Sequence, residues 1–399
     1  MASFSVFLVA YVLSQFFRSF LAVIAPELSV ELDLGGDDLG RMSAAWFAAF
    51  ALAQPLVGWI LDRFGPRRSV PPAMVLAALG SLVFATAAGP WQCAIAMALI
   101  GLGCAPVYMG ALYGFGRTHH PARFAFLSSW LLGLGSAGNL LAATPLAWLT
   151  TLAGWRLAFL IIALATVLAA CLLWAVVRDP PPAAATGPTG TAFAELAGIA
   201  AMRPLWPLLP LTLVSYAVVV AERGLWIGPY LREVHGLDAI ARGNAALAMA
   251  AAMSLGALLY GPLDRLVDSR KWVVVTGTVV TAAAYLTLGL HAGTGVLAAS
   301  ALLTAIGGFG MTYGVLMAHA RAFFPDRLLG RGITFMNLLF IGGAGLIQPL
   351  SGNWVASMTA KGLAPTLIYG GLHVAFGTAL ALTGLIYLLS TDRRPSDPD

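Results

Sequence analysis

The chain has very little charge, and this scarcity decides its class. Only 10% of its 399 residues are Asp, Glu, Lys or Arg, whereas 59% are hydrophobic. Soluble globular domains carry about 25% charged residues, so this composition excludes them and indicates a membrane protein. The hydrophobic residues come in blocks of about 20, the length at which a helix crosses a hydrocarbon core of about 30 Å. The alternating pattern of a membrane β-strand is missing, so we predict membrane-spanning helices.

Other absences narrow the function. The three cysteines, Cys93, Cys104 and Cys171, lie in apolar blocks without CxxC spacing, which indicates neither a disulfide framework nor a zinc site. The phosphate-binding pattern GxxxxGK[ST] is missing, which argues against ATP hydrolysis. His119 and His120 have no acid or cysteine near them in the sequence, so we expect no catalytic site and no enzyme. We also expect no cofactor. The net charge of +5 comes from basic residues in short turns, which indicates a topology signal rather than nucleic-acid binding.

Twelve apolar segments are long enough to span a membrane, six on either side of a proline-rich interruption. We therefore predict an N-terminal six-helix half at 1–177, a linker with a short interfacial helix at 178–204, a C-terminal half at 205–390 and a tail at 391–399. The predicted spans are 4–26, 42–61, 70–88, 91–114, 124–150, 156–177, 205–230, 243–263, 272–291, 295–320, 331–351 and 366–390.

The distribution of Lys and Arg predicts the orientation. Fifteen of these 22 residues fall in turns on one side of the predicted spans, in the linker or in the tail, and five fall in the opposite turns. By the positive-inside rule, the richer side and both termini face the cytoplasm, in a membrane of the bacterial inner-membrane type.

The two halves repeat each other at a nearly constant offset. Tyr11 and Arg18 are matched 205 positions later by Tyr216 and Arg223. The same offset joins three residues of the fourth span to three of the tenth, namely Gly103, Tyr108 and Leu112 to Gly308, Tyr313 and Met317. This indicates an internal duplication, an arrangement in which a binding site forms at the interface of the repeats.

Two charged turns also repeat. "GWILDRFGPRR" (58–68) ends the second span, and "GPLDRLVDSRK" (261–271) ends the eighth. Glycine near a helix end permits a close helix approach, and aspartate there can accept hydrogen bonds from a helix N-terminus or pair with arginine. We therefore expect a cytoplasmic clasp that forms in one conformation and opens in another; the alternative is a turn that only obeys the positive-inside bias. The clasp residues are Gly58, Asp62, Arg63, Gly65, Arg67, Arg68, Gly261, Asp264, Arg265, Arg270 and Lys271.

These motifs, the six-plus-six arrangement and "GWRLAF" at 154–159 together resemble the major facilitator superfamily. The resemblance implies an all-α membrane protein with twelve transmembrane helices in two pseudo-symmetric halves, acting as a secondary active transporter by alternating access. "AYVLSQFFRSFLAVIAPEL" (10–28) is most similar to the branch of CcoA-type copper importers and riboflavin transporters. That similarity implies copper or a small organic cofactor or anion as cargo, with riboflavin as the alternative.

Arg18, Glu222 and Arg223 are the charged residues well inside predicted spans. A charge at the membrane centre costs at least about 2.5 kcal/mol, so each needs a partner or a water-filled cavity. Two hypotheses stay open. In one, the cluster binds solute and Glu222 carries a coupling proton; in the other, Arg18 and Glu222 form a gate salt bridge.

Further polar and aromatic side chains could line the same cavity, or could form hydrogen bonds between helices instead. These are Gln54, Tyr108, Asn139, Trp226 and Tyr313. Met249 and Met253 share a helix face, and thioethers suit Cu(I), although methionine is also an ordinary apolar filler. The chain contains no His-x-x-x-Met sequence, which the copper members carry.

The predicted partners are a small solute, the lipid bilayer and a coupling proton, and we expect a monomer. The fifth span lacks the glycine-proline-x-x-glycine-glycine pattern of drug exporters in the superfamily, which favours uptake. The alternative of another class is a receptor that binds solute without moving it.

Overall fold

The computed structural model describes residues 2–118, 127, 130–131, 133–179, 199–324 and 329–393. Within these ranges the regular secondary structure is entirely helical, and no strand occurs. This agrees with the predicted all-α class. It also follows from the environment, because a helix satisfies every backbone hydrogen bond within its own segment.

Contacts divide the chain into two compact units. Unit 1 holds Met1–Thr186 and Asp238–Leu247, and unit 2 holds Gly187–Leu237 and Ala248–Asp399. The sequence interpretation placed Asp238–Leu247 in the second half. In the structure Arg242 of this segment pairs with Glu27, and Thr144 donates a 2.8 Å hydrogen bond to Asn244, both within unit 1.

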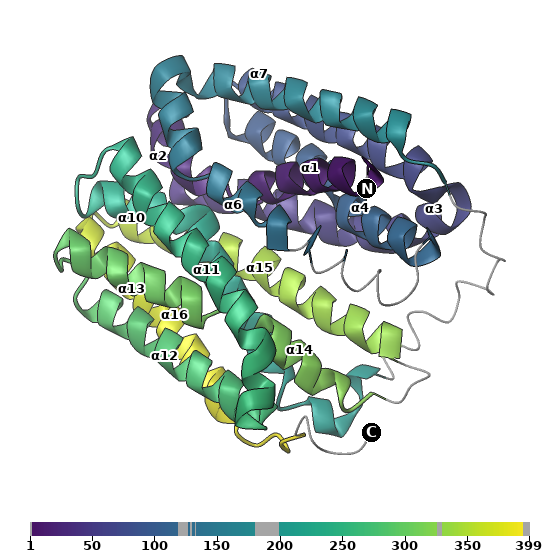
Figure 1. The fold of residues 1–399 in the computed structure, drawn as a ribbon. Helices are drawn as coiled ribbons and strands as arrows, with labels where there is room; N and C mark the ends of the chain where they lie inside the picture. Colours follow the sequence, from purple (N-terminus) through teal and green to yellow (C-terminus); the bar gives the residue numbers. More distant parts are fainter. Residues whose placement is uncertain are drawn as a thin grey trace. The chain divides into compact units, whose positions relative to one another are not determined.

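Unit 1 contains six helices in the described residues, two of them with an internal kink (Figure 1). They are α1 (Ala2–Phe17), α2 (Leu21–Leu32), α3 (Gly36–Ala85), α4 (Pro90–Thr118), α6 (Ala137–Leu141) and α7 (Thr144–Val176). The kinks lie at Gly65 in α3 and Gly154 in α7, where φ is 75° and 74°. Glycine adopts this left-handed conformation without steric penalty, so each kink is a tight turn between two spans.

Unit 2 begins with a 3₁₀ turn, η2 (Arg203–Leu205), followed by α9 (Leu209–Ala221), a π-helix η3 (Glu222–Trp226) and α10 (Ile227–Glu233). The helix α11 (Ala239–Val267) starts in unit 1 and continues into unit 2. The remaining helices are α12 (Arg270–Leu290), α13 (Val296–Phe309), α14 (Tyr313–Arg321), α15 (Leu329–Ala360) and α16 (Pro365–Tyr387).

The twelve predicted spans can be traced through these helices. Nine described helices are long and apolar enough to cross a membrane, and α1 with α2 makes a tenth span bent by 47°. One of the nine, Gly133–Val176, holds most of the predicted span 156–177 and, before the Gly154 kink, the part of the predicted span 124–150 from Gly133 on; most of 124–132 lies outside the described residues. The predicted span 42–61 forms the part of α3 before Gly65.

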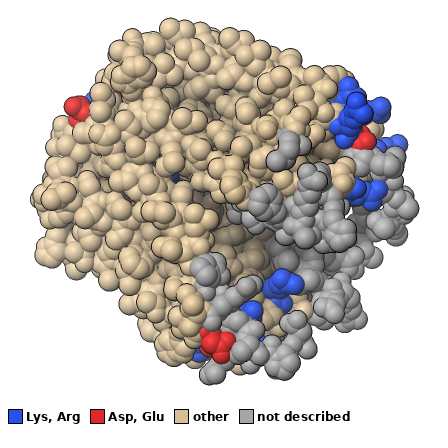
Figure 2. All heavy atoms as spheres, viewed as in Figure 1, with Lys and Arg blue, Asp and Glu red and all other residues tan. Residues whose placement is uncertain are grey.

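The surface suits a lipid environment. Large apolar side chains stand exposed on many helices, for example Leu52, Leu266 and Leu297, of which Leu297 is 85% exposed. In the space-filling view, the described surface is largely uncharged and the charged side chains are confined to small groups near its borders (Figure 2). A hydrocarbon solvent favours such a surface, whereas water does not.

Two equivalent glycines set the closest helix contacts. A Cβ built on Gly138 of α6 would lie 2.0 Å from the Val12 carbonyl oxygen of α1. A Cβ on Gly343 of α15 would lie 1.9 Å from the Leu213 carbonyl oxygen of α9. Their offset is 205, the same as in the sequence repeat. Small residues let membrane helices approach backbone to backbone, so the duplication is visible in the packing of each unit.

The "GWR" sequence has a local structural role in unit 1. The Arg156 guanidinium donates 2.9 Å hydrogen bonds to the carbonyl oxygens of Ala85 and Ala87, at the C-terminal end of α3. Arg156 also pairs with Glu31, which accepts a 2.6 Å hydrogen bond from the Trp155 indole. The cation thus satisfies carbonyl groups that have no partner within their own helix.

Candidate functional site

The two arginines predicted from the sequence repeat lie at equivalent breaks in two helices. Arg18 lies in the three-residue break between α1 and α2, where the axis bends by 47°. Arg223 lies in the π-helix η3 between α9 and α10. A break leaves backbone groups outside the regular α-helical ladder, and π-helical turns are frequent at functional sites.

Arg18 is held by aromatic rings in unit 1. Its guanidinium carbon lies 5.3 Å from the ring centroids of both Trp46 and Phe50 on α3. Such cation–π contacts stabilise a cation by about 0.5–2 kcal/mol, and the stabilisation is larger where water is excluded. Arg18 therefore keeps its charge within an apolar span, on a side chain that is only partly buried.

Two polar residues named from the sequence form side-chain hydrogen bonds in unit 1. Asn139 of α6 accepts a 2.6 Å hydrogen bond from Ser19, the residue after Arg18. The Gln54 side chain donates to the Phe50 carbonyl one turn earlier in α3, at 3.5 Å. The structure thus brings Asn139 to the Arg18 break, whereas Gln54 bonds to its own helix.

Two tyrosine pairs also repeat between the units. The rings of Tyr11 and Tyr108 lie 5.0 Å apart in unit 1, and those of Tyr216 and Tyr313 lie 5.7 Å apart in unit 2. The Tyr313 hydroxyl donates a 3.1 Å hydrogen bond to the Asn337 side-chain oxygen. Tyr216 interacts electrostatically with Arg223, so the second pair belongs to the surroundings of the buried arginine.

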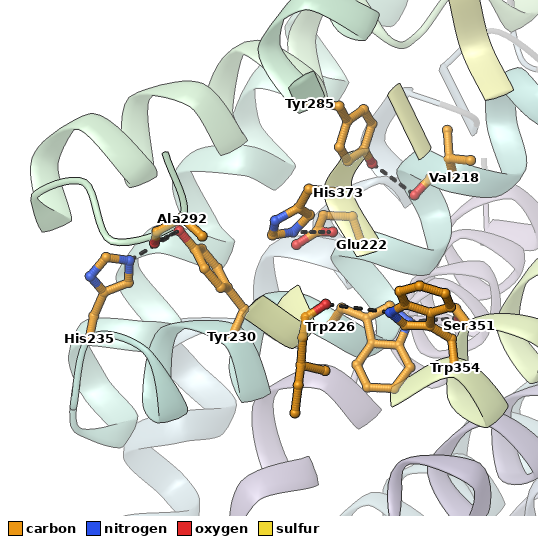
Figure 3. Close-up of polar contacts among 11 residues, drawn as sticks. Val218, Glu222, Trp226, Tyr230, His235, Tyr285, Ala292, Ser351, Trp354 and His373 are labelled. Carbon is orange, nitrogen blue, oxygen red and sulfur yellow. Dashed lines mark hydrogen bonds and ion pairs between the residues drawn. The ribbon is translucent and has the colours of Figure 1, made fainter. Parts of the chain in front are cut away.

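Glu222 has a partner that the sequence interpretation did not name. His373 of α16 lies with Nε2 3.2 Å from Glu222 Oε2, and both side chains are fully buried (Figure 3). The two residues are 151 positions apart, and a lone histidine in an apolar helix gave no signal of this pairing. A pair between Arg18 and Glu222 would join the two units and stays a prediction.

Trp226 is also fully buried. Its indole donates a 2.8 Å hydrogen bond to Ser351 Oγ; both residues are labelled in Figure 3. Ser351 in turn donates to the Gln348 carbonyl oxygen at 2.8 Å. The ring lies 6.3 Å from that of Tyr369. In this structure Trp226 therefore fixes the end of η3 against α15 and α16.

His235 follows α10 and contacts the same region. Its Nε2 lies 3.1 Å from the Tyr230 hydroxyl (Figure 3). Burial lowers the pKa of His235 below its usual value, because desolvation disfavours the charged imidazolium. His235 is therefore neutral at pH 7 and places no positive charge beside the Tyr230 hydroxyl.

An aspartate at the start of the linker binds to the first charged turn, 58–68. Asp179 Oδ1 accepts a 2.6 Å hydrogen bond from the Arg67 backbone amide, and Oδ2 lies 3.8 Å from Arg68 Nε. Arg67 Nε donates to the Trp174 carbonyl at 2.9 Å. The carboxylate thus caps the helix that begins after Gly65, a role that the sequence interpretation did not assign to Asp179.

The second charged turn has an equivalent cap. Asp392 accepts hydrogen bonds from the Lys271 amide at 3.2 Å and from Ser269 Oγ at 2.5 Å. Lys271 Nζ donates to the carbonyls of Leu388 and Ser390, and Arg270 donates to that of Arg393. The motif residues therefore hold the chain beyond α16 against the start of α12.

The other clasp residues contribute less to holding the two charged turns in the described structure. Gly58 is exposed, and a Cβ there would meet no described atom within 4 Å, so the close helix approach expected at this position stays a prediction. The Arg63 guanidinium lies 5.7 Å from the Phe64 ring. The side chains of Asp62, Gly261, Asp264 and Arg265 lie outside the described part of the structure.

Met249 and Met253 pack on α13. A Cβ on Gly307 would lie 2.9 Å from Met249 Cγ and 3.2 Å from Met253 Cγ. Among the described residues, no group of three or more His, Cys, Asp or Glu side chains is placed to hold a metal ion. Both methionines thus pack against α13, and a metal-binding role for them stays a prediction.

Comparison with known proteins identifies the architecture. Residues 7–349 match the Major Facilitator Superfamily. A D-xylose-proton symporter structure aligns with a TM-score of 0.79 at 17% identity, covering 98% of this chain and 97% of that one. A bacterial homologue of the human lysosomal transporter Spinster, inward-facing and occupied, aligns with a TM-score of 0.76 at 17% identity, covering 97% and 96%. At these identities the likeness shows the shared fold.

Sequence relatives cover a shorter part of the chain. A galacturonate transporter of Dickeya chrysanthemi is 28% identical over 165 residues, which are 41% of this chain and 48% of that protein. A hexuronate transporter of Escherichia coli (strain K12) is 29% identical over 153 residues, which are 38% and 35%. The matched segments thus span less than half of the length of these relatives.

Proposed function

Because the chain belongs to the major facilitator superfamily, we propose that it is a secondary transporter whose cargo is a small organic anion bearing a carboxylate. The observation that carries this proposal is the pair of equivalent arginines, Arg18 and Arg223, each at a break in a membrane helix. Arginine binds carboxylates through two parallel N–H donors and keeps its charge throughout the physiological pH range.

The transport geometry follows from the duplication. Transporters built from repeats bind solute near the middle of the membrane between the repeats, and discontinuous helices direct polar groups toward it. Arg18 and Arg223 occupy equivalent positions in spans 1 and 7, so we assign each of them, in its own unit, to binding of the carboxylate. Asn139 accepts a hydrogen bond from the residue after Arg18, and Tyr313 packs on Tyr216, which interacts with Arg223. We assign Tyr108, the counterpart of Tyr313 in unit 1, to the same role.

Two relatives support an anionic cargo. Galacturonate and hexuronates are sugar acids, and the transporters named for them share 28% and 29% identity with parts of this chain. A neutral sugar such as D-xylose would leave the two arginines without an anion. Sugar acids are therefore the first probes of the cargo.

Copper and riboflavin are the competing cargoes suggested by sequence resemblance. Met249 and Met253 pack on Gly307, which argues for a filler role and against copper. Trp226, the ring best suited to stack on a flavin, is fully buried and bonded to Ser351. Both observations favour the organic anion over these two cargoes.

The remaining features complete the proposal. We assign the protein to a bacterial-type inner membrane, with both termini in the cytoplasm, as a monomer that catalyses uptake. The clasp residues of the two charged turns would then face the cytoplasm. There Asp179 and Asp392 accept hydrogen bonds from backbone amides at the starts of two spans. Alternating access requires these cytoplasmic ends to separate and rejoin once per cycle.

Solute counterflow in proteoliposomes tests the cargo. Vesicles containing the purified protein are preloaded with one unlabelled compound, and entry of the same labelled compound is measured. The panel contains galacturonate, glucuronate, simple mono- and dicarboxylates, D-xylose, riboflavin and Cu(I). We expect saturable counterflow with a carboxylate and none with D-xylose, riboflavin or Cu(I).

Arginine variants show whether recognition uses the proposed residues. Loss of a hydrogen bond between charged partners costs about 1.5–3 kcal/mol, so Arg18→Gln and Arg223→Gln should each raise the KM for the carboxylate about tenfold to hundredfold. Arg41→Gln, an arginine whose side chain is 52% exposed, is the matched control and should leave the KM unchanged. Counterflow of riboflavin, Cu(I) or D-xylose without any carboxylate would refute the proposal, and carboxylate binding without counterflow would indicate a receptor.

A further inference from the structure

We propose that Glu222 and His373 together form a proton-binding site within unit 2, and that loading of this site is linked to anion binding at Arg223. The inference rests on the proposed transport of an anion. It assigns the coupling proton to a dyad formed by two helices, and it sets the ratio of protons to anions.

The geometry of the dyad is that of a shared proton. His373 Nε2 and Glu222 Oε2 are 3.2 Å apart, and both side chains have no exposed surface. Within the described residues, Glu222 Oε1 and His373 Nδ1 have no hydrogen-bond partner. A buried carboxylate facing a neutral imidazole carries a charge that the imidazole does not balance, whereas one proton between them makes the pair neutral. The two groups then hold one proton between them.

Three tyrosines surround the dyad without donating to it. Tyr285 of α12 donates to the Val218 carbonyl at 2.9 Å, and Tyr230 of α10 donates to the Ala292 carbonyl at 3.2 Å (Figure 3). Tyr369 of α16 hydrogen-bonds to Glu233. The rings of Tyr230 and Tyr285 lie 4.9 Å and 6.2 Å from the His373 ring. These hydroxyls are already engaged, so they do not replace the proton.

Two further ionisable groups near the dyad matter for its charge. His235 contacts Tyr230 and is neutral at pH 7, so it adds no charge. Arg223 is adjacent to Glu222 in η3 and is 4% exposed. Glu222 and Arg223 lie in one π-helical turn. A change in the charge of Glu222 therefore changes the position of the Arg223 side chain and its affinity for an anion.

A count of charges then gives the linkage. Without a proton, the dyad is −1 and Arg223 is +1, so the cluster is neutral. One proton taken from water onto the dyad cancels the charge of Glu222, and the positive charge of Arg223 is then balanced by a bound anion. Net charge is costly in the membrane interior, so the anion and the proton each favour binding of the other. The structure therefore points to transport of one proton with each monovalent anion.

Proteoliposomes with a pH dye trapped inside test this directly. An inward proton gradient should drive accumulation of the carboxylate identified by counterflow, and the lumen should gain about one proton per anion by the count above. Glu222→Gln fixes the dyad in an uncharged form, so counterflow should continue while gradient-driven accumulation and proton entry are lost. His373→Gln should shift the pH profile of KM, and His291→Gln, an exposed histidine at the end of α12, should leave it unchanged.

The outcomes separate this inference from the proposed function. Absence of carboxylate counterflow in the wild type refutes the proposed function. Counterflow with an unchanged proton ratio in Glu222→Gln, or an unchanged pH profile in His373→Gln, overturns the dyad alone.

If these variants fail to fold, proton uptake during carboxylate binding can be measured with the wild-type protein. Purified wild-type protein in weakly buffered detergent should take up a proton when it binds the carboxylate. Its Kd should rise up to tenfold per pH unit on the alkaline side of the dyad's titration. No proton uptake between about pH 5 and pH 9, where carboxyl and imidazole groups titrate, overturns the inference.

Discussion

Gly343 offers a sharp test of the helix packing that positions Arg223. A Cβ on Gly343 would lie 1.9 Å from the Leu213 carbonyl oxygen and 2.9 Å from its carbonyl carbon. Since real Cβ contacts do not fall below 3.0 Å, Gly343→Ala must push α9 away from α15 by about 1.1 Å. The contacted atoms are all backbone, so no side-chain rotation relieves the overlap.

The neighbouring residue is the matched control. A Cβ on Gly342 would meet no described atom within 4 Å. Both alanine substitutions gain about 1 kcal/mol of helix propensity, so this gain cancels in their difference. What remains is the overpacking cost at Gly343, typically about 1–3 kcal/mol.

Thermal unfolding of the purified protein in detergent, followed by tryptophan fluorescence, measures this difference. Gly343→Ala should unfold at a clearly lower temperature than Gly342→Ala, and it should also show reduced counterflow because α9 leads into the turn that carries Arg223. Equal unfolding temperatures for the two variants would refute the close contact and the packing argument built on it.

Three further substitutions test other contacts. Gly138→Ala, the equivalent of Gly343→Ala in unit 1, should lower the unfolding temperature through overlap with α1; a neutral result would contradict the repeated packing. Asp179→Ala should cost about 0.5–2 kcal/mol, measured by thermal unfolding, because the Arg67 amide loses its capping carboxylate. Arg156→Gln should cost about 1 kcal/mol, because it leaves two helix-end carbonyls without their donor, and an unchanged unfolding temperature would show that water replaces it.

The membrane class, the helical fold and the family followed from the sequence. Apolar blocks of span length and sparse charge determine that class directly, because the bilayer permits few alternatives. The constant offset paired Arg18 with Arg223, and the structure places both at helix breaks. The breaks themselves were not predictable, since neither "SQFFRSFL" nor "VAERGLW" contains proline and a π-helical turn has no simple sequence pattern.

The features that the sequence did not predict depend on contacts between residues far apart in the chain. His373 meets Glu222 across 151 positions, and Asp179 meets Arg67 across 112, so only the three-dimensional fold brings them together. The sequence interpretation gave Gly58 a close-packing role from its place at a helix end. That role stays a prediction, and the structure shows close packing at Gly138 and Gly343, in the middle of apolar segments where glycine carries no distinctive local signal.

Arg18 and Arg223 are proposed to recognise a carboxylate. The most direct measurement compares counterflow of the best carboxylate with inhibition by its uncharged methyl ester, in the wild type and in a double variant, Arg18→Gln with Arg223→Gln. We predict that the wild type prefers the free acid and that the double variant loses this preference by at least about tenfold, because both charged donors are gone. An unchanged preference in a folded double variant would contradict the claim.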